Sequence, residues 1–184
     1  DTFTMTLDIT DPLYVAEASV AGFLNGEEVN VKDLLYGCIL PSGADAAMGL
    51  AIKIAGSEEN FVKLMNKRAQ EMGLKGTNFT NVSGLYNADN YSTAYDMAVI
   101  TECALRNELC RKVLSTYQYT TKKTPQNPDG ITLSSTLFSY MYGDEPVTAE
   151  IMGGKTGYVN ESGYCISTFG KNKAGTEEYI VVTM

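Results

Sequence analysis

The stretch that decides the fold is "GGKTGYVNESGYC", residues 153–165. Its second half carries aromatic and β-branched residues on both sides of the turn-forming group "NESG", which predicts two antiparallel strands joined by a hairpin. Its first half, Gly-Gly-Lys-Thr-Gly, could hold a phosphate, line an acyl-transfer site or form a tight turn. The surrounding sequence decides among these three interpretations.

The phosphate-binding interpretation fails on spacing. A phosphate loop of the Walker type needs a glycine six positions before the lysine and a helix directly after the motif. The residue six before Lys155 is Ala149, and strand-forming and turn-forming residues follow Gly157. Neither requirement is met.

Further strands are expected on both sides of the hairpin turn and beyond it. The turn-forming groups "NESG" and "KNKAGTE" separate three strands at hairpin distances, which predicts an antiparallel sheet. Alternation in "YQYTTKKT" (117–124) and at Phe3, Met5, Leu7 and Ile9 predicts strands there as well. The three strands of the sheet are expected at 155–159, 164–169 and 179–183.

Helices are predicted in the middle of the chain. Residues 31–56 form an apolar segment broken by Pro-Ser-Gly, which predicts a buried helix, a loop and a second helix that ends at Gly56. Ser57 is the expected N-cap of a helix that ends at Gly73. Thr93 and Asn107 are the expected N-caps of two more helices. The apolar stripe of the helix after Ser57 is Phe61, Leu64, Met65 and Met72.

This order of elements predicts the fold class α+β, with a helical region packed on an antiparallel sheet. We expect the helical part at about 27–115, the sheet part at about 148–184, and a single, partial domain over 1–184. Both ends look cut, because the chain begins at Asp1 and stops inside an expected strand.

Composition excludes several classes of function. The 184 residues include 14 Lys and Arg against 22 Asp and Glu, a net charge of -8, and no basic cluster of the kind that binds nucleic acid. No stretch is apolar enough to span a membrane. The chain has no histidine, which removes Ser-His-Asp and Cys-His catalysis and most zinc sites. We therefore expect no metal and no cofactor, and a lysine or a carboxylate as the base of any hydrolase.

The four cysteines indicate neither a metal site nor a disulfide framework. They lie in apolar runs and show no CxxC spacing, so we expect buried free thiols. They are Cys38, Cys103, Cys110 and Cys165.

Two short motifs carry possible chemistry. Lys155 can supply a fixed positive charge and Thr156 a hydrogen bond to a carboxylate, while Gly157 lets a ligand approach the strand. The alternative is an ordinary hairpin strand with a surface lysine. In "PSGADAA", Ser42 is either a helix cap or a carrier of protons.

Four segments, in order, give the sequence a family resemblance. The segments "DLLYGCILPSGADAA", "NFVKLMNKRAQEMGLKGTNFTNVSGL", "YSTAYDMAVIT" and "GGKTGYVNESGYC" resemble the D-alanyl-D-alanine carboxypeptidases of peptidase family S11, the low-molecular-mass penicillin-binding proteins with a fold like that of β-lactamases. In that family the motifs S-x-x-K, S-x-N and K-T-G meet in one cleft.

The resemblance implies a role for each matched residue. Ser42 corresponds to the serine of S-x-N and would pass a proton to the leaving amine, and Lys155 would supply the positive field. Thr156 would bind the substrate carboxylate, and the N–H of Tyr158 would be one of two oxyanion donors. Gly157 belongs to the same substrate-binding strand.

The sequence also departs from the family pattern. No serine in the chain is followed by lysine three residues later, so the attacking serine and its lysine are expected on residues before Asp1, and this chain alone should be inactive. Ala44 stands at the substrate-binding position of the S-x-N asparagine, which removes a side-chain amide.

The resemblance implies an extracytoplasmic bacterial enzyme that removes the terminal D-alanine of peptidoglycan stem peptides through a serine acyl-enzyme and that β-lactams inhibit. Two alternatives stay open. One is a non-catalytic relative that binds wall peptide, which Ala44 favours. The other is a β-lactamase-like hydrolase, which would need a positioned carboxylate for deacylation.

Overall fold

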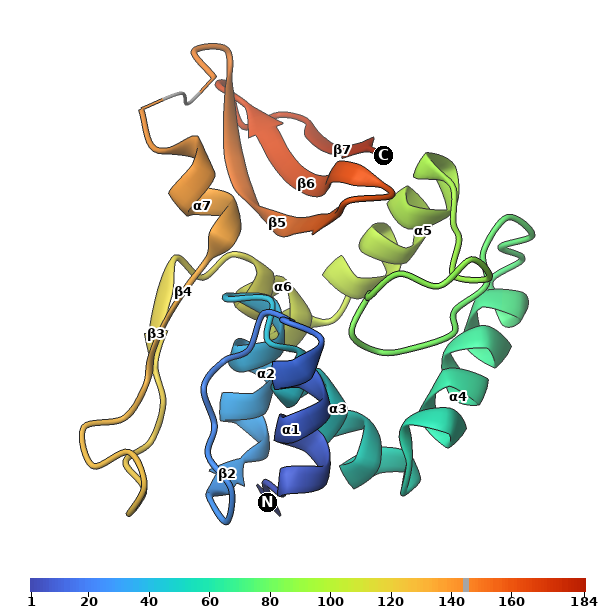
Figure 1. Ribbon diagram of the computed structural model, residues 1–184. Coiled ribbons are helices and arrows are strands. Elements are labelled where there is room, and N and C mark those ends of the chain that lie inside the picture. The colour runs from blue at the N-terminus through green and yellow to red at the C-terminus, as the bar shows by residue number, and fades with distance from the viewer. Residues whose placement is uncertain (144–145) are drawn as a thin grey trace.

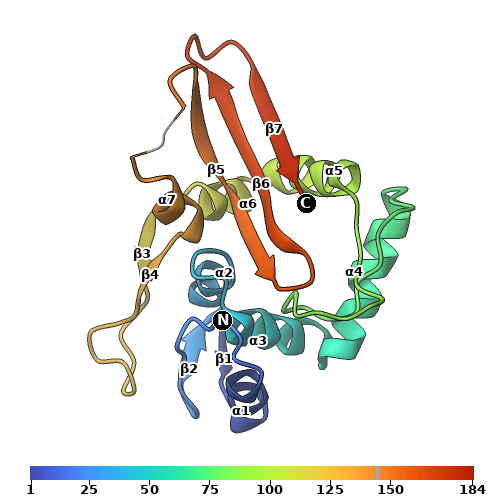
Figure 2. The ribbon, with the colours of Figure 1, turned by 45° about the horizontal axis from the view of Figure 1, so that its top comes forward.

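The computed structural model describes residues 1–143 and 146–184, and it is an α+β structure as expected (Figure 1). Helices from the first two-thirds of the chain lie on one side, and a three-stranded antiparallel sheet from the last third lies on the other. Figure 2 shows α7 beside the β5 edge of this sheet and α5 under it. The helices are α1 (Leu7–Val15), α2 (Val31–Ile39), α3 (Ala44–Ala55), α4 (Glu58–Glu71), α5 (Ala94–Leu105), α6 (Glu108–Leu114) and α7 (Thr136–Met141), and the strands are β1 (Thr2–Thr4), β2 (Glu28–Asn30), β3 (Gln118–Thr120), β4 (Thr132–Ser134), β5 (Ala149–Val159), β6 (Gly163–Asn172) and β7 (Glu178–Thr183).

The C-terminal sheet confirms the expected hairpins. Its strand order is β5-β6-β7, all antiparallel, and all three strands are longer than predicted. The β5–β6 turn closes through Gly163, whose φ of 69° lies in the left-handed region that favours glycine.

The glycine pair before Lys155 lets β5 pass close to other backbone. A Cβ on Gly153 would lie 2.4 Å from the carbonyl oxygen of Leu114, the last residue of α6, and one on Gly154 would lie 2.3 Å from the carbonyl oxygen of Ser167 in β6. Both distances are too short for any side chain. The glycines therefore set how closely the sheet packs against the helical part.

The predicted helix caps are confirmed. The side chains of Ser57, Thr93 and Asn107 each accept a hydrogen bond from a backbone N–H in the first turn of α4, α5 and α6. Gly56 ends α3 in the left-handed conformation, with φ of 80°. These ends depend on residues only a few positions apart, which is why local sequence predicts them.

The prediction of a strand from the alternation at residues 3–9 is mostly wrong. Only β1 is extended, paired with β2, and the chain turns into α1 at Leu7. Ile9 and Leu13, one helical turn apart, are both buried against the helical core, so tertiary packing selects the helix. Over so few residues the two periodicities cannot be told apart.

The segment between α6 and β5 holds two elements that differ from the sequence expectation. The strand expected at 117–124 covers only β3, which pairs with β4 in a short hairpin. Helix α7 follows β4 and was not predicted, because it has only six residues. A residue outside α7 holds its first turn in place, because the N–H of Thr136 donates to the carbonyl oxygen of Leu40, at the end of α2, at 3.0 Å.

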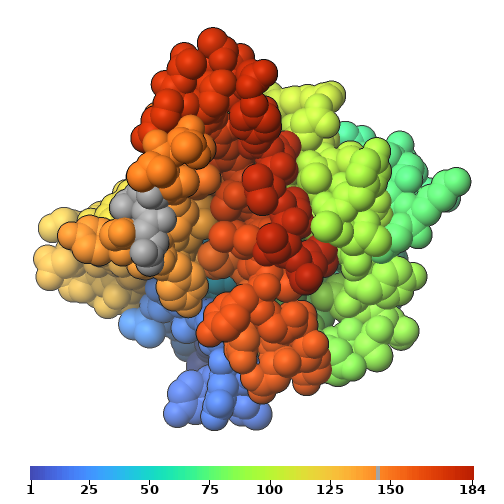
Figure 3. All heavy atoms as spheres, turned by 90° about the horizontal axis from the view of Figure 1, so that it is seen from above, coloured from blue at the N-terminus to red at the C-terminus, as the bar shows by residue number. Residues whose placement is uncertain are grey.

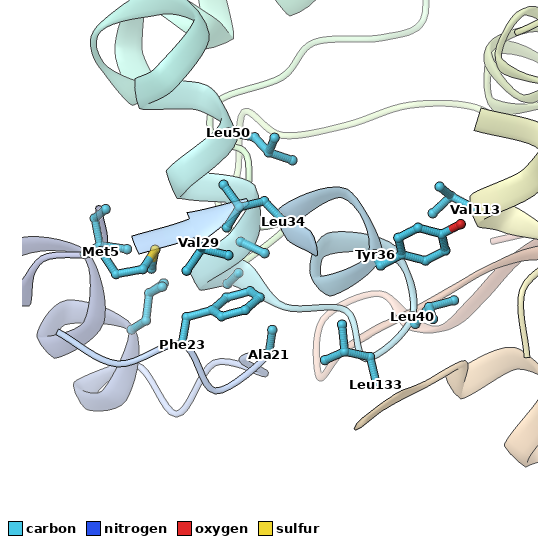
Figure 4. Close-up of a cluster of buried hydrophobic side chains, with 14 residues drawn as sticks. Met5, Ala21, Phe23, Val29, Leu34, Tyr36, Leu40, Leu50, Val113 and Leu133 are labelled. Carbon is cyan, nitrogen blue, oxygen red and sulfur yellow. The ribbon is translucent and has the colours of Figure 1, made fainter. Parts of the chain in front are cut away.

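The main core lies in the helical part and joins α1, α2, α3 and β2 (Figure 4). Met5 and Leu34 are completely buried in it. At one side Tyr36 stacks on Tyr119, with ring centroids 3.8 Å apart, and the Tyr119 hydroxyl donates to the buried carboxylate of Asp33 at 2.6 Å. This contact attaches the β3–β4 hairpin to α2.

All four cysteines are free thiols, as expected. Cys38, Cys103 and Cys165 are partly buried, but Cys110 is exposed on α6, so its predicted burial was wrong. An apolar run on a seven-residue helix does not show which face packs.

A buried carboxylate ties the loop before β2 to the first turn of α3. Asp45, 1% exposed, accepts hydrogen bonds from the backbone N–H groups of Ala21 at 2.7 Å, Gly22 at 3.0 Å and Phe23 at 3.2 Å. Its place in the first helical turn also suits a negative charge. The loop and the start of α3 are therefore one rigid unit.

Replacing Asp45→Ala should lower the free energy of unfolding by about 3 kcal/mol, because three N–H groups of the loop lose a charged acceptor. Asp45→Asn should cost less, since one oxygen acceptor remains. Urea unfolding of the full-length protein measures both. Asp129→Ala is the control, because the Asp129 side chain is fully exposed. Equal unfolding midpoints for Asp45→Ala and Asp129→Ala would contradict this role.

Candidate active site

The two motifs singled out in the sequence meet in the structure. The Lys155 ammonium, on β5, donates to the Ser42 hydroxyl at 2.8 Å and to the carbonyl oxygen of Thr156 at 2.7 Å. Ser42 lies in the loop between α2 and α3, so the two partners are 113 positions apart in the sequence. This contact joins the helical part to the sheet.

The Ser42 loop is tight and strained. Ser42 has φ of 62°, in the left-handed region that residues other than glycine seldom adopt. The next residue has no room for a side chain, since a Cβ on Gly43 would lie 2.6 Å from the carbonyl oxygen of Gly37. Such strain persists where the surroundings enforce it, and it is concentrated at functional sites. The Ser42 hydroxyl is not a helix cap, because Gly43 is the N-cap of α3.

Burial and a neighbouring thiol shift the pKa of Lys155 in opposite directions. Desolvation lowers the pKa of Lys155, and the charge of Cys38 as a thiolate would raise it. Burial raises the pKa of Cys38, while Lys155 lowers it. The ammonium is thus an incompletely hydrated charge whose field is weakly screened.

A cleft of about 420 Å³ opens beside this contact. Its walls come from the Ser42 loop, from α7 and from both strands of the β5–β6 hairpin. In the space-filling view the sheet strands lie between α7 on one side and α5 on the other (Figure 3). The lining residues include Ser19, Ser42, Thr136, Tyr140, Thr156, Gly157, Tyr158 and Tyr164.

Three predicted residues of the K-T-G strand, Thr156, Gly157 and Tyr158, line this cleft, whereas Lys155 reaches it only through its contact with Ser42. Thr156 is half-buried, and Gly157 and Tyr158 are exposed. The rings of Tyr158 and Tyr164 lie 4.6 Å apart across the hairpin, at an interplanar angle of 39°. The strand edge is therefore open to a ligand and rimmed by aromatic rings.

Ala44 lies behind the cleft rather than in its lining. It is 4% exposed, at the start of α3, and its N–H donates to the carbonyl oxygen of Ser19 at 2.8 Å. Its contribution to the site is through backbone, which orients the Ser19 side of the cleft.

Sequence reasoning missed Thr136 and Tyr140, which line the cleft from α7. The Thr136 hydroxyl lies 2.6 Å from the Thr156 hydroxyl. No local pattern marks these residues, because a contact between distant segments brings α7 to the site. Within residues 1–143 and 146–184, no three His, Cys, Asp or Glu side chains are grouped to hold a metal ion.

The geometry suits recognition of an extended chain that ends in a carboxylate. Several hydroxyls and an open strand edge line one cleft, and a fixed cation reaches it through its hydrogen bond to Ser42. Main-chain pairing with β5 would place such a ligand beside Ser42. Ser42 is in turn in contact with a proton donor, the Lys155 ammonium.

Known proteins resemble this chain in sequence. The family model for D-alanyl-D-alanine carboxypeptidases, peptidase S11, matches residues 3–184. D-alanyl-D-alanine carboxypeptidase DacF of Bacillus subtilis is 38% identical over 146 residues, which are 79% of this chain and 36% of that protein. The D-alanyl-D-alanine carboxypeptidase of Streptomyces sp. strain K15 is 33% identical over 169 residues, 85% of this chain and 55% of that protein.

Solved structures agree with the sequences. The Streptomyces K15 DD-transpeptidase superposes with a TM-score of 0.83 at 31% identity, over 100% of this chain and 70% of that one. This match confirms the predicted penicillin-binding-protein fold. The chain spans about a third of the length of the Bacillus relative and about half that of the Streptomyces relative. The chain belongs to the S11 peptidase family of D-alanyl-D-alanine carboxypeptidases.

Proposed function

We propose that the full-length protein removes the terminal D-alanine from peptidoglycan stem peptides that end in D-Ala-D-Ala. The observation that carries this proposal is the 2.8 Å contact between the Lys155 ammonium and the Ser42 hydroxyl, beside a cleft that Ser42 and Thr156 both line. The carboxypeptidase names of the relatives give the reaction its class.

The reaction is acyl transfer through a serine ester. An attacking serine, on residues outside this chain because no S-x-x-K is present here, gives its proton to the lysine of that motif and adds to the carbonyl of the penultimate D-alanine. The tetrahedral oxyanion is stabilised by backbone N–H groups, one of them that of Tyr158. The C–N bond then breaks, and the terminal D-alanine leaves with a proton delivered through Ser42. Water hydrolyses the ester and restores the serine.

The site residues of this chain each have a defined part in this scheme. Lys155 stabilises negative charge near Ser42 and keeps its hydroxyl oriented for proton transfer. Thr156 binds the terminal carboxylate by a charge-assisted hydrogen bond. Gly157 leaves the strand edge free for the substrate backbone. β-Lactams, which imitate the dipeptide, would acylate the same serine.

The substrate sets the place of action outside the cytoplasmic membrane, at the cell surface or in the periplasm. Among the described helices, none combines the length and apolar character needed to cross a membrane.

A second candidate is a relative that binds wall peptide without cleaving it. Ala44 favours it, because the position lacks the side-chain amide that would hold the acyl-amide group of the substrate. The missing amide removes one hydrogen bond to the substrate, which weakens substrate binding by about 1–3 kcal/mol.

Labelled penicillin distinguishes these two candidates. The full-length protein should form a stoichiometric adduct on a serine before residue 1, and Lys155→Ala should slow acylation at least about 100-fold, the scale of one electrostatic contact to a transition state. Mass spectrometry locates the modified peptide. Lys171→Ala is the matched control, since Lys171 lies on β6 and pairs with Glu150.

An unlabelled but folded full-length protein would overturn the carboxypeptidase proposal and leave the binding function. Residues 1–184 alone should form no adduct. A stoichiometric adduct on this chain would place the nucleophile within it.

The alkaline side of the pH profile should report Lys155. Its ammonium form is the active one, and burial lowers the pKa of Lys155 from the ordinary lysine value of 10.5, so kcat/KM should fall with an apparent pKa below 10.5. Lys155→Arg should move this fall to higher pH, because a guanidinium stays protonated. An unchanged alkaline limb in Lys155→Arg would show that another group controls it.

A further inference from the structure

Two threonine hydroxyls face each other in the cleft. Thr136 Oγ1, at the start of α7, lies 2.6 Å from Thr156 Oγ1 on β5, a short hydrogen bond between hydroxyls. Both residues are half-buried, and both line the cleft together with Ser42. The pair is therefore accessible from the space where a ligand would bind.

The backbone of Thr136 is held in place by a buried part of the chain. Its N–H donates to the carbonyl oxygen of Leu40 at 3.0 Å, and Leu40 is 1% exposed. The next residue of α7, Leu137, is also 1% exposed. Because Leu40 stands two positions before Ser42, one rigid stretch of backbone positions both Ser42 and Thr136.

These contacts form a closed ring around one wall of the cleft. Ser42 contacts Lys155, Lys155 continues to Thr156 along β5, and Thr156 contacts Thr136. Thr136 returns through Leu40 to Ser42. A ring closed in this way fixes the distance between the Ser42 and Thr156 hydroxyls.

The number of protons limits what the threonine pair can do. Each hydroxyl has one hydrogen, and a carboxylate only accepts hydrogen bonds. Thr156 can bind a carboxylate only if its own hydrogen is free, and this requires Thr136 to be the donor between the two hydroxyls. The Lys155 ammonium leaves the Thr156 hydroxyl free, because it donates to the Thr156 carbonyl oxygen instead.

We propose that Thr136 is a positioning residue that sets the specificity for a free terminal carboxylate. It donates its proton to Thr156 Oγ1 and thereby directs the Thr156 O–H toward the substrate. This role rests on the proposed function and deepens it: the enzyme selects peptides that end in a carboxylate over those that end in a neutral amide.

Two peptides and three variants test the role in the full-length enzyme. The peptides are an acyl-D-Ala-D-Ala with a free carboxylate and the same peptide with a C-terminal carboxamide. Thr136→Val removes the hydroxyl at nearly constant volume, and Thr136→Ser keeps it. Thr132→Val is the matched control, because Thr132 also pairs with a threonine hydroxyl, that of Thr120 at 3.4 Å, but lies on the β3–β4 hairpin.

Thr136→Val should raise KM for the carboxylate peptide about 10-fold, the effect of one hydrogen bond that supports a charged ligand, with kcat changed less than about twofold. KM and kcat for the carboxamide peptide should stay within about twofold of wild type. The preference for the carboxylate peptide, expressed as the ratio of the two kcat/KM values, should therefore fall about 10-fold. Thr136→Ser and Thr132→Val should behave as wild type. If Thr136→Val is not folded by its melting temperature, Thr136→Ala makes the same comparison.

Equal losses on both peptides, or no loss on either, would overturn the role of Thr136 while wild-type turnover upholds the carboxypeptidase function. A folded wild-type enzyme that cleaves neither peptide would overturn the proposed function and this role with it.

Discussion

The structure depends on one partly desolvated ammonium group that holds two parts of the chain together. Lys155 lies on β5, yet its hydrogen bond to Ser42 reaches the loop between α2 and α3. A buried charge is stable only when surrounding groups satisfy it, so both partners must be held where they are. The backbone around Lys155 and around Ser42 holds each of these residues in position.

On the sheet side, glycine allows the approach. Gly153 and Gly154 let β5 run against the end of α6 and against β6 at distances that exclude any side chain. The register that results places Lys155 opposite Ser167, whose hydroxyl lies 2.7 Å from that of Thr101 on α5. The sheet that carries the cation is thus fixed against α6 by backbone contact of β5 and against α5 by a side-chain hydrogen bond of β6.

On the helical side, a carboxylate and a strained serine keep the loop in place. Asp45 binds three consecutive backbone N–H groups from the loop before β2, and the Ser42 backbone adopts a left-handed conformation next to it. The free energy gained by satisfying buried polar groups offsets the strain. The same α2 end supplies the Leu40 carbonyl that receives α7, so the third wall of the cleft is fixed from the same place.

Much of this protein follows from local sequence. Helix caps and hairpin turns depend on residues within a turn of one another, so sequence predicts them. Examples are the caps at Ser57, Thr93 and Asn107 and the hairpin at Gly163. The two motifs that meet at Lys155 and Ser42 were also recognisable, because their residue types and spacing resemble those of a known family. Prediction failed where the outcome depends on distant partners, as at Leu7–Val15, where burial of Ile9 and Leu13 selects a helix.

The sequence by itself determined the α+β class, the caps and the residues of the K-T-G strand. Only the tertiary structure decided that α7 forms and that Thr136 meets Thr156, because a six-residue helix is too short to be stable without packing. It also decided that Ala44 lies behind the cleft and not in its lining. The physical reason is the same in each case: local propensity is set by neighbours along the chain, whereas burial and hydrogen-bond partners are set by segments that are remote in sequence.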